Sequence, residues 1–343
     1  MLKQNRLKIL VTGGAGFIGS NFIHSLLAHY PEHSIINLDK LTYAGNIDNI
    51  ADLQDNKHHT FIMGDICDKS LVNAVIPGTD LIVHFAAETH VDRSIHEAGE
   101  FLQTDIIGTF ILLEAAKKHK VKLFIQISTD EVYGSIEKGF CTENSPLMPS
   151  NPYSASKAAA DRLAYSYYKT YQLPVIITRC SNNYGPYQHP EKLIPLFVTN
   201  AIEDKPLPLY GDGLNIRDWI YVEDHCTALE LIINKGDVGE VYNIATHHFR
   251  TNIEVTKIIL KYLHKHETLI TYVKDRPGHD RKYSITNSKL KKLGWKPLTT
   301  FRNGVQKTVQ WFIDHEAWWK KIKHQNAEFI KFHATHYQSL EKG

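Results

Sequence analysis

The sequence predicts an α/β protein in which a doubly wound parallel sheet is joined to a smaller, discontinuous α/β lobe. Short apolar runs rich in valine and isoleucine recur along the first half of the chain and alternate with segments of helical periodicity. Such alternation is typical of parallel sheets with helices on both faces and right-handed crossovers. A length of 343 residues exceeds one typical domain, which favours two lobes around one site.

Six strands are expected in the sheet. They are apolar almost throughout instead of alternating, as strands covered on both faces are. Their expected bounds are Lys8–Thr12, Ser34–Asp39, Thr60–Gly64, Leu81–Ala86, Lys122–Ser128 and Val175–Arg179. The stretches between them, among them Gly16–Tyr30 and Thr104–His119, have the pattern of helices.

The pattern loosens from about Pro186 onward. Turn-forming residues cluster in Pro186–Pro195 and Asp204–Gly213, and a strand-like run returns at Val241–Ala245. Near the C-terminus, Phe301–Lys323 has helical character, with a buried stripe expected at Val305, Val309, Trp311 and Phe312. We therefore expect a first domain over residues 1–185 with a return segment at about 219–248, and a second lobe formed by 186–218 and 249–343.

Composition excludes several classes of protein. The formal charge of +2 lacks the basic excess of nucleic-acid binders, and the apolar runs fall short of the roughly 18 residues that span a bilayer. The histidine pairs His58-His59 and His247-His248 lack metal-site spacing, so no metal is expected. The first residues have no secretory signal, and the four cysteines form no CxxC pair, which favours the cytoplasm.

A glycine-rich turn follows the first expected strand. Gly13, Gly16 and Gly19 form a GxxGxxG pattern at the start of a helix, where backbone can approach a pyrophosphate closely. Asp39 ends the second strand 20 residues later, where an acidic side chain accepts ribose hydroxyls and repels a 2′-phosphate. The motif predicts a Rossmann-type site that prefers NAD to NADP, with Asp65 and Ile66 near the adenine. As the alternative, Asp39 is a helix cap or turn residue.

A second motif is Tyr153 followed by Lys157 at the start of an expected helix. The spacing of four places both on one face, where the ammonium and a cationic nicotinamide would lower the pKa of the phenol. Tyr153 would then act as the base while hydride leaves the same carbon. Taken alone, such a pair is more often structural.

The fifth strand ends in Ser128-Thr129-Asp130-Glu131, and strand carboxyl ends face the ligand crevice in such sheets. Thr129 is expected to hydrogen-bond a substrate hydroxyl. Two carboxyl groups with separated pKa values can serve as the acid and base of an elimination. The alternative reading is that Asp130 and Glu131 belong to a solvated loop.

Together, the glycine turn and the YxxxK motif resemble the extended short-chain dehydrogenase/reductase superfamily. From about residue 7 to 300, further stretches are similar to its dTDP-glucose 4,6-dehydratase family. These stretches are Leu38–Asn46, Glu88–Ile95, Ser128–Gly134 (STDEVYG), Cys180–Leu196, Gly211–His225 and Asp275–Tyr283 (DRPGHDRKY).

The resemblance implies a lyase of deoxysugar biosynthesis that acts in three steps. Tyr153, aided by Lys157 and Thr129, deprotonates the C4 hydroxyl while NAD takes the C4 hydride. Glu131 then removes the C5 proton and Asp130 protonates the departing C6 hydroxyl. Hydride returns to C6, so that tightly bound NAD is regenerated in each turnover.

The resemblance also implies the binding residues and the assembly. Catalytic residues are Thr129, Asp130, Glu131, Tyr153 and Lys157. The cofactor is expected at Gly13, Gly16, Phe17, Ile18, Gly19, Asp39, Lys40, Leu41, Thr42, Asp65, Ile66, Phe85, Ala86, Ala87, Thr89, Thr104, Tyr153, Lys157 and Asn183. The nucleotide-sugar is expected at Thr89, Thr129, Asn182, Lys192, Leu193, Pro208, Leu209, Tyr210, Arg217, Asn252, Asp275, Arg276 and His279. The family also implies a homodimer packed through the helices that follow the fourth and fifth strands.

The sequence departs from the family between Tyr242 and Asn252, where members typically have YNIGG and this chain has YNIAT. Loss of two glycines restricts the backbone near the expected nucleotide pocket. Thr89 stands where serine is more usual. These departures leave the preference between thymine and uracil open. A UDP-sugar 4,6-dehydratase, a UDP-sugar 4-epimerase and a non-catalytic NAD-dependent sensor are the alternative functions.

Overall fold

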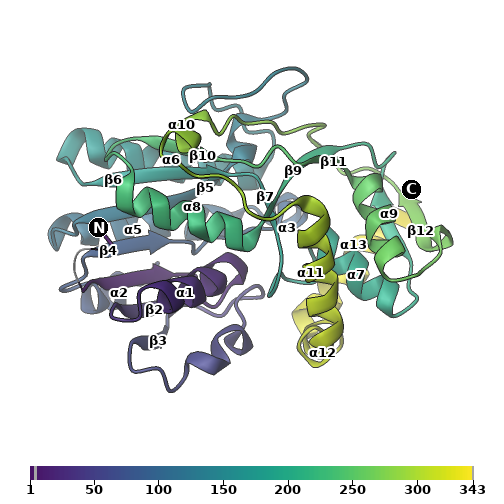
Figure 1. Ribbon diagram of the computed structural model, residues 1–343, viewed down its shortest axis with the longest axis horizontal. Helices are drawn as coiled ribbons and strands as arrows, with labels where there is room; N and C mark the ends of the chain where they lie inside the picture. Colours follow the sequence, from purple (N-terminus) through teal and green to yellow (C-terminus); the bar gives the residue numbers. More distant parts are fainter. Residues whose placement is uncertain (4–5, 342–343) are drawn as a thin grey trace.

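A seven-stranded parallel sheet forms the centre of the protein (Figure 1). The computed structural model describes residues 1–3 and 6–341, with side chains up to residue 336. The strands lie in the order β10-β6-β5-β4-β1-β2-β3. Their bounds are β1 (Lys8–Thr12), β2 (Ser34–Asp39), β3 (His59–Met63), β4 (Leu81–His84), β5 (Leu123–Thr129), β6 (Val175–Cys180) and β10 (Val241–Ile244). The predicted fold class is confirmed.

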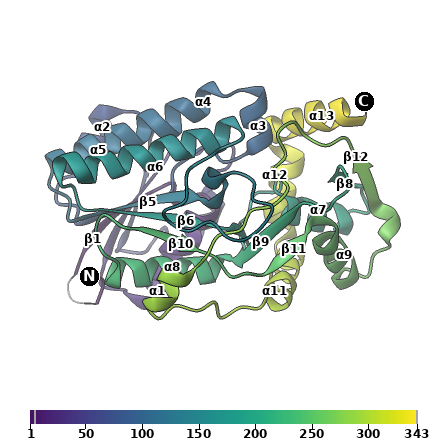
Figure 2. The ribbon, with the colours of Figure 1, turned by 90° about the horizontal axis from the view of Figure 1, so that it is seen from above.

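Helices cover both faces of this sheet (Figure 2). On one face α1 (Phe17–His29) packs against α8 (Val222–Lys235). On the other face α5 (Thr109–Lys118) lies between α2 (Lys69–Val75) and α6 (Pro152–Tyr171). Successive residues of one strand enter two different cores, because side chains alternate across a sheet. The strands therefore read as continuous apolar runs.

The remaining elements build a second region, with its own core around Tyr184, Phe197 and Trp319. A three-stranded sheet has the order β11-β9-β7, and a two-stranded sheet pairs β12 with β8. These strands are β7 (Asn182–Tyr184), β8 (Leu207–Tyr210), β9 (Ile216–Tyr221), β11 (Phe249–Thr251) and β12 (Ile270–Val273). The longer helices are α7 (Leu193–Ile202), α9 (Asn252–Tyr262), α11 (Phe301–Asp314), α12 (Glu316–Gln325) and α13 (Ala327–Glu341).

Short helical segments connect these parts. They are η1 (Ile47–Leu53), α3 (Val91–His96), α4 (Gly99–Phe101), η2 (Leu102–Gly108), η3 (Asp130–Tyr133), η4 (Glu267–Leu269) and α10 (Ser288–Lys292). Across the described residues 1–3 and 6–341, no helix combines the length and apolar character needed to cross a membrane.

The structure differs from the sequence-based expectations in two helices. The segment expected at 104–119 begins earlier, as the π-helical η2, and continues as α5. The expected C-terminal segment is two helices, because His315 leaves the helical conformation at φ −118° and ψ 41°. Val305, Val309 and Phe312 are buried as predicted, whereas Trp311 is only half-buried.

Candidate active site

The glycine turn after β1 brings two segments of backbone into close contact. Gly13 has φ +71°, and a Cβ there would lie 2.6 Å from the backbone nitrogen of Ala86. A Cβ on Gly19 would lie 2.2 Å from the carbonyl oxygen of Gly13. Gly16, the N-cap of α1, provides no side chain to the first turn of that helix. The free N–H groups of this turn therefore face an open cradle that suits a pyrophosphate.

Asp39 ends β2 beside this cradle. Its carboxylate accepts hydrogen bonds from the backbone N–H of Ala15 (2.9 Å) and of Leu41 (2.8 Å). Burial raises the pKa of Asp39, while these hydrogen bonds oppose the rise. At the adjacent rim, Lys40 forms an ion pair of 2.9 Å with Asp65. The arrangement suits the ribose end of a dinucleotide.

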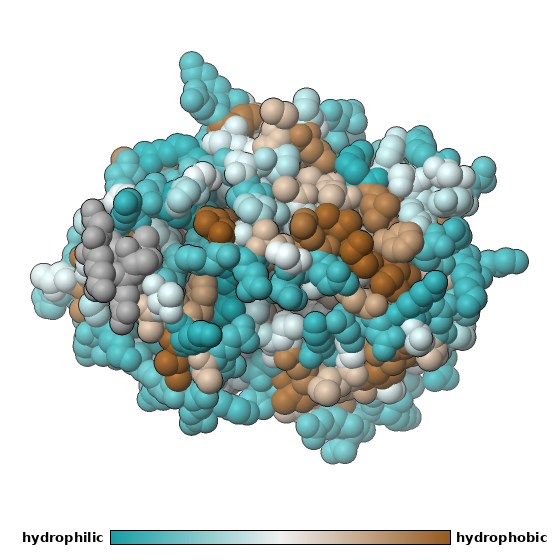
Figure 3. All heavy atoms as spheres, turned by 180° about the vertical axis from the view of Figure 1, so that it is seen from behind, coloured by the Kyte–Doolittle hydropathy of each residue, from teal (hydrophilic) through white to brown (hydrophobic). Residues whose placement is uncertain are grey.

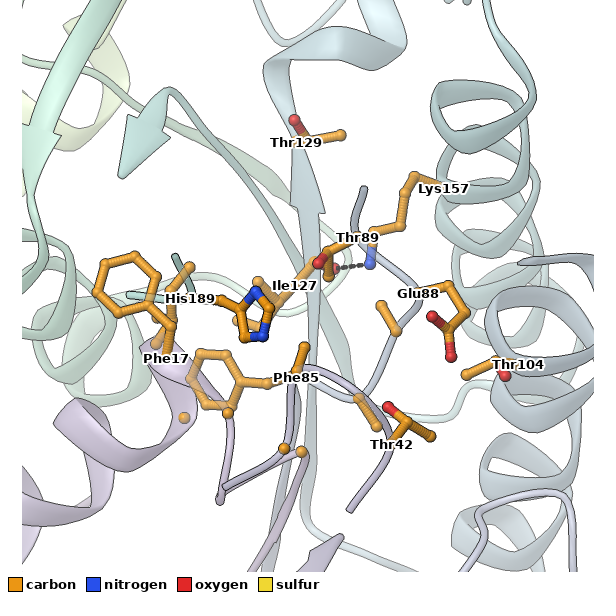
Figure 4. A pocket seen from close by; sticks show the side chains of 18 of the residues that line it. Phe17, Thr42, Phe85, Glu88, Thr89, Thr104, Ile127, Thr129, Lys157 and His189 are labelled. Carbon is orange, nitrogen blue, oxygen red and sulfur yellow. Dashed lines mark hydrogen bonds between the residues drawn. The ribbon is translucent and has the colours of Figure 1, made fainter. Parts of the chain in front are cut away.

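A pocket runs from the glycine turn to the ends of β5 and β6. All the residues predicted for the cofactor line it except Leu41, whose side chain packs against the core of the sheet. Thr129, Asp130, Glu131, Asn182 and Lys192 line its far end. Figure 4 shows Phe17 and Phe85 on one side of the pocket and Lys157, Glu88 and Thr104 on the other.

Helix α6 carries Tyr153 and Lys157 into this pocket. Its first turn is fixed by a capping box, in which the Asn151 side chain accepts the N–H of Ser154 at 2.9 Å. The Lys157 ammonium donates to the carbonyl oxygen of Ile127 at 2.8 Å, the dashed line of Figure 4. Burial lowers the pKa of Lys157.

The protein's own groups shift the pKa of Tyr153 upward. Burial, followed by the charge of Glu131, raises this pKa well above its ordinary value. The expected lowering rests on the Lys157 ammonium together with a cationic nicotinamide, and the ammonium is held by the Ile127 carbonyl. The protein by itself thus keeps the phenol protonated.

Two buried carboxyl groups beside Tyr153 and Lys157 were missed by the sequence-based reasoning. Asp105 accepts hydrogen bonds from the Ser156 hydroxyl (2.5 Å) and from the backbone N–H of Glu88 (2.9 Å). Burial raises the pKa of Asp105 to about 6 and that of Glu88 to about 7. An acidic residue within the apolar helical segment 104–119 was the only available signal for Asp105.

The acid pair lies where β5 gives way to η3. Thr129 accepts the N–H of Glu131 at 3.3 Å and donates to Asp130 at 3.4 Å. Asp130 is only 2% exposed, and its Oδ2 has no hydrogen-bond partner among the described residues. Burial, followed by the charges of Glu131 and Asp218, raises the pKa of Asp130 well above its ordinary value. These surroundings favour the protonated form of Asp130, which can donate its proton.

A second pocket meets the first beside Glu131, because Glu131, Asn182 and Lys192 line both. The other predicted substrate residues in its wall are Leu193, Pro208, Leu209, Tyr210, Arg217, Asn252, Arg276 and His279. Thr89 and Thr129 line only the first pocket. Asp275 lines neither pocket and contacts His279 at 2.5 Å.

Several polar atoms of the second pocket have no partner in the described part of the chain. They are Oδ1 of Asn182, Oδ1 of Asn252 and Nε of Arg276. Buried polar atoms without partners are costly, so these atoms suit a polar ligand with both donors and acceptors. No group of three or more His, Cys, Asp or Glu within residues 1–3 and 6–341 has the arrangement of a metal site.

The departure from the YNIGG pattern is accommodated by a buried carboxylate. Asp218 accepts the N–H of Thr246 (3.0 Å), the Thr246 hydroxyl (2.9 Å) and the N–H of His248 (2.7 Å). His247, between them, takes a left-handed φ of +64°. The loop is therefore fixed without the glycines, and Asn252 beyond it lines the second pocket.

Comparison with known proteins places the chain in a family. The sequence family described as GDP-mannose 4,6 dehydratase matches residues 10–308. A dTDP-glucose 4,6-dehydratase of Neisseria meningitidis serogroup B is 48% identical over 340 residues, which cover 92% of this chain and 96% of that relative. The chain belongs to the dTDP-glucose 4,6-dehydratase family. Another relative of that name, from Streptomyces niveus, is 49% identical and covers 92% of this chain and 96% of its own length.

Solved members of the dTDP-glucose 4,6-dehydratase family have the same fold. One from Streptomyces venezuelae, with NAD bound, has a TM-score of 0.91 at 48% identity, covering 92% of this chain and 100% of that one. One from Bacillus anthracis, in complex with NAD, has a TM-score of 0.87 at 53% identity over the same shares. A UDP-glucose 4-epimerase of Thermus thermophilus reaches 0.83 at 29% identity, covering 90% of this chain and 100% of that one.

Proposed function

We propose that this protein is an NAD-dependent dTDP-glucose 4,6-dehydratase, a hydro-lyase that forms dTDP-4-keto-6-deoxyglucose. The observation that carries the proposal is the acid pair Asp130 and Glu131, which lines the first pocket and of which Glu131 also lines the second. Simple redox chemistry or epimerisation has no need of such a pair, whereas elimination of water needs an acid and a base. Family membership and the NAD-bound relatives support the same reading.

The first pocket fits NAD. The cradle at Gly13 and Gly19 leaves no room for side chains, and the N-terminal turn of α1 offers N–H groups to a diphosphate. Asp39 is placed to accept ribose hydroxyls, and its charge disfavours a 2′-phosphate. NAD, when bound, supplies a hydride acceptor and a positive charge beside Tyr153.

In the proposed first step, Tyr153 takes the proton of the C4 hydroxyl. The protein's own groups raise the pKa of the Tyr153 phenol. A positively charged ligand beside the phenol lowers that pKa and thus favours the phenolate that can accept the proton. Lys157 stabilises that phenolate by its charge while the Ile127 carbonyl orients the ammonium. Thr129 is assigned to hydrogen-bond the same substrate hydroxyl.

Elimination is assigned to the acid pair. The C4 ketone acidifies the C5 proton, which Glu131 removes. Asp130, whose raised pKa keeps it protonated, donates to the C6 hydroxyl as it leaves. The cycle is completed when the hydride returns to C6 and a proton is restored to C5, with no net consumption of NAD.

The second pocket is the proposed nucleotide-sugar site. Lys192, Leu193 and Asn182 are assigned to the sugar and diphosphate, and Arg217, Asn252, Arg276 and His279 to the phosphates and ribose. Pro208, Leu209 and Tyr210 are assigned to the base. The unpartnered atoms of Asn182, Asn252 and Arg276 support this assignment.

Domain division and assembly are also proposals. We assign NAD binding to residues 1–185 with 219–248, and nucleotide-sugar binding to 186–218 with 249–343, of which 342 and 343 lie outside the described residues.

Apolar side chains gather on the face seen in Figure 3, the face on which α5 lies. Leu102, Ile107 and Phe110 on η2 and α5 are 50%, 42% and 43% exposed, which supports a homodimer through these helices.

The four cysteines are free thiols in the structure, which supports a cytoplasmic, reducing location. They are Cys67, Cys141, Cys180 and Cys226.

The function is tested by incubating the protein with NAD and either dTDP-glucose or UDP-glucose. We expect a 4-keto product that absorbs in alkali, formed faster from dTDP-glucose. A sugar of galactose configuration would instead indicate a 4-epimerase, and turnover of UDP-glucose alone would indicate a UDP-sugar dehydratase. Binding of NAD without any turnover would favour a sensor.

A further inference from the structure

The C-terminal helix α13 packs against the outside of the second pocket. Its start at Ala327 lies beyond residue 308, where the family match ends. Figure 2 shows α13 beside α3, at the side of the molecule where β8 and β12 lie. Pocket-lining residues contact it from behind: Phe332 meets the edge of the His90 ring at 5.6 Å between centroids.

His336 connects α13 to the pocket wall by hydrogen bonds. It is 6% exposed, and its Nε2 lies 2.5 Å from the hydroxyl of Tyr210. The Tyr210 hydroxyl donates to Asp92 at 3.1 Å, and Asp92 accepts from Arg276 at 3.3 Å. With the Tyr210 hydroxyl donating to Asp92, we assign the proton of the shorter hydrogen bond to Nε2 of His336, which then donates to Tyr210. In this assignment Nδ1 of His336 accepts from Nε2 of His96 at 3.3 Å.

The rest of the helix is held by the same wall. Arg93 lies over the Phe332 ring at 4.4 Å from its centroid and donates to Glu328 at 2.6 Å. The same guanidinium binds Glu191, whose neighbour Lys192 lines both pockets. The Phe332 ring in turn stacks on His336, with centroids 5.3 Å apart. The helix thus packs against the pocket wall at His90 and Tyr210, and Arg93 links it to Glu191, a third residue of that wall.

We propose that α13 braces the nucleotide-sugar pocket and that His336 is a positioning residue for substrate binding. Its N–H orients the Tyr210 hydroxyl toward Asp92, and Asp92 orients the guanidinium of Arg276. The inference rests on the proposed function for the identity of the ligand, a thymidine diphosphate group. Substrate binding depends on His336, whereas the chemical steps at Tyr153 and the acid pair do not.

The test is a double-mutant cycle between His336→Phe and Tyr210→Phe. Phenylalanine keeps the ring that stacks on Phe332 and removes the N–H. We expect His336→Phe to raise KM for dTDP-glucose and Kd for thymidine diphosphate by about tenfold, with kcat within about twofold of the original protein. In the Tyr210→Phe background the same change should have no further effect, because the hydroxyl that it orients is gone.

Thr335→Ala, on the exposed side of α13, is the matched control and should leave KM and Kd unchanged. An unchanged KM in His336→Phe, or an equal rise in both backgrounds, would overturn the proposal. If His336→Phe does not fold, His336→Ala takes its place in the cycle. Thymidine diphosphate binding is measured by calorimetry without turnover. A protein that lacks dehydratase activity but shows the predicted coupling would refute the proposed function and leave this inference standing.

Discussion

Asp130 and Glu131 are neighbours in sequence, yet their surroundings differ. Asp130 is buried with one oxygen unpartnered, whereas Glu131 lines both pockets and is reached by the Tyr283 hydroxyl at 3.4 Å. Environments that separate two carboxyl groups are the usual basis for dividing acid and base roles between them. The proposed division therefore predicts distinct consequences for the two residues.

Glu131→Gln should block the reaction after C4 oxidation. Tyr153 and Lys157 are untouched, so hydride is still removed, but the C5 proton has no base. We expect kcat to fall by at least about a hundredfold while reduced nicotinamide accumulates on the enzyme, as measured by its absorbance. Glu137→Gln, an exposed residue of the next loop, is the control. Full activity in Glu131→Gln would refute the role given to this carboxylate.

Asp105 predicts a pH dependence of stability. Its pKa is raised from 3.8 to about 6 in the folded protein, so between those values the folded state binds more protons than the unfolded state. Stability therefore falls as pH rises from about 4 to about 6, and the loss persists above that range. A shift of this size corresponds to about 3 kcal/mol at most.

Asp105→Asn should remove that loss. The free energy of unfolding of the variant, minus that of the original protein, should grow between pH 4 and 6 and then stay constant. Asp55→Asn, at an exposed site, should show no such growth. A difference that is independent of pH would mean that Asp105 is not destabilised by burial.

Part of the site was predictable at the residue scale and part was not. Gly13, Asp39, Tyr153 and the acid pair stand in motifs whose spacing already carries the chemistry. Asp105 is different, because its effect on the site depends on burial. One acidic residue in the sequence does not reveal whether its side chain is buried. Burial also raises the pKa of Tyr153, and the spacing to Lys157 does not reveal this contribution.

Among the elements, α6 links fold to chemistry most directly. Its capping box at Asn151 fixes the turn that carries Tyr153, and Pro152 supplies the φ angle of the first helical position. The strands of the large sheet were predicted within a few residues because both of their faces are buried. The pairing of β8 with β12 was not predicted. These short strands lie about 60 residues apart, and their residues show no distinctive alternation of apolar and polar side chains.

Asn151→Ala should destabilise α6 at its N-terminus. Loss of the cap costs about 1 kcal/mol of unfolding free energy, measured by denaturant titration. We also expect a lower kcat, because Tyr153 lies in the first turn of the helix. Ser166→Ala, in the exposed middle of α6, serves as the control and should change neither quantity by a comparable amount. Equal effects of the two changes would contradict the role of the cap.

For the whole molecule, the proposed dimer makes a separate prediction. Phe110→Glu places a charge in the apolar surface on α5, which should shift the protein from dimer to monomer in sedimentation experiments. Leu298→Glu changes a residue that is 74% exposed but remote from that surface, and should leave the mass unchanged. A protein that is monomeric before any substitution would refute the dimer.

The fold class of the whole molecule was predictable from the sequence. For the second region the sequence indicated only that a discontinuous lobe exists, and not how its strands pair. Parallel sheets impose alternating strands and helices on the sequence, so the class is evident from periodicity. The second region is assembled from segments far apart in the chain, and α13 joins it through contacts such as that between His336 and Tyr210. Contacts of this range leave no local signal.

The central claim is that hydride removed from C4 returns to C6 after water has left. The most direct measurement uses dTDP-glucose that carries deuterium at C4, followed by mass and NMR analysis of the product. We expect a 4-keto-6-deoxy sugar with the deuterium at C6. Deuterium retained at C4 of an epimerised sugar, or lost to solvent, would contradict it.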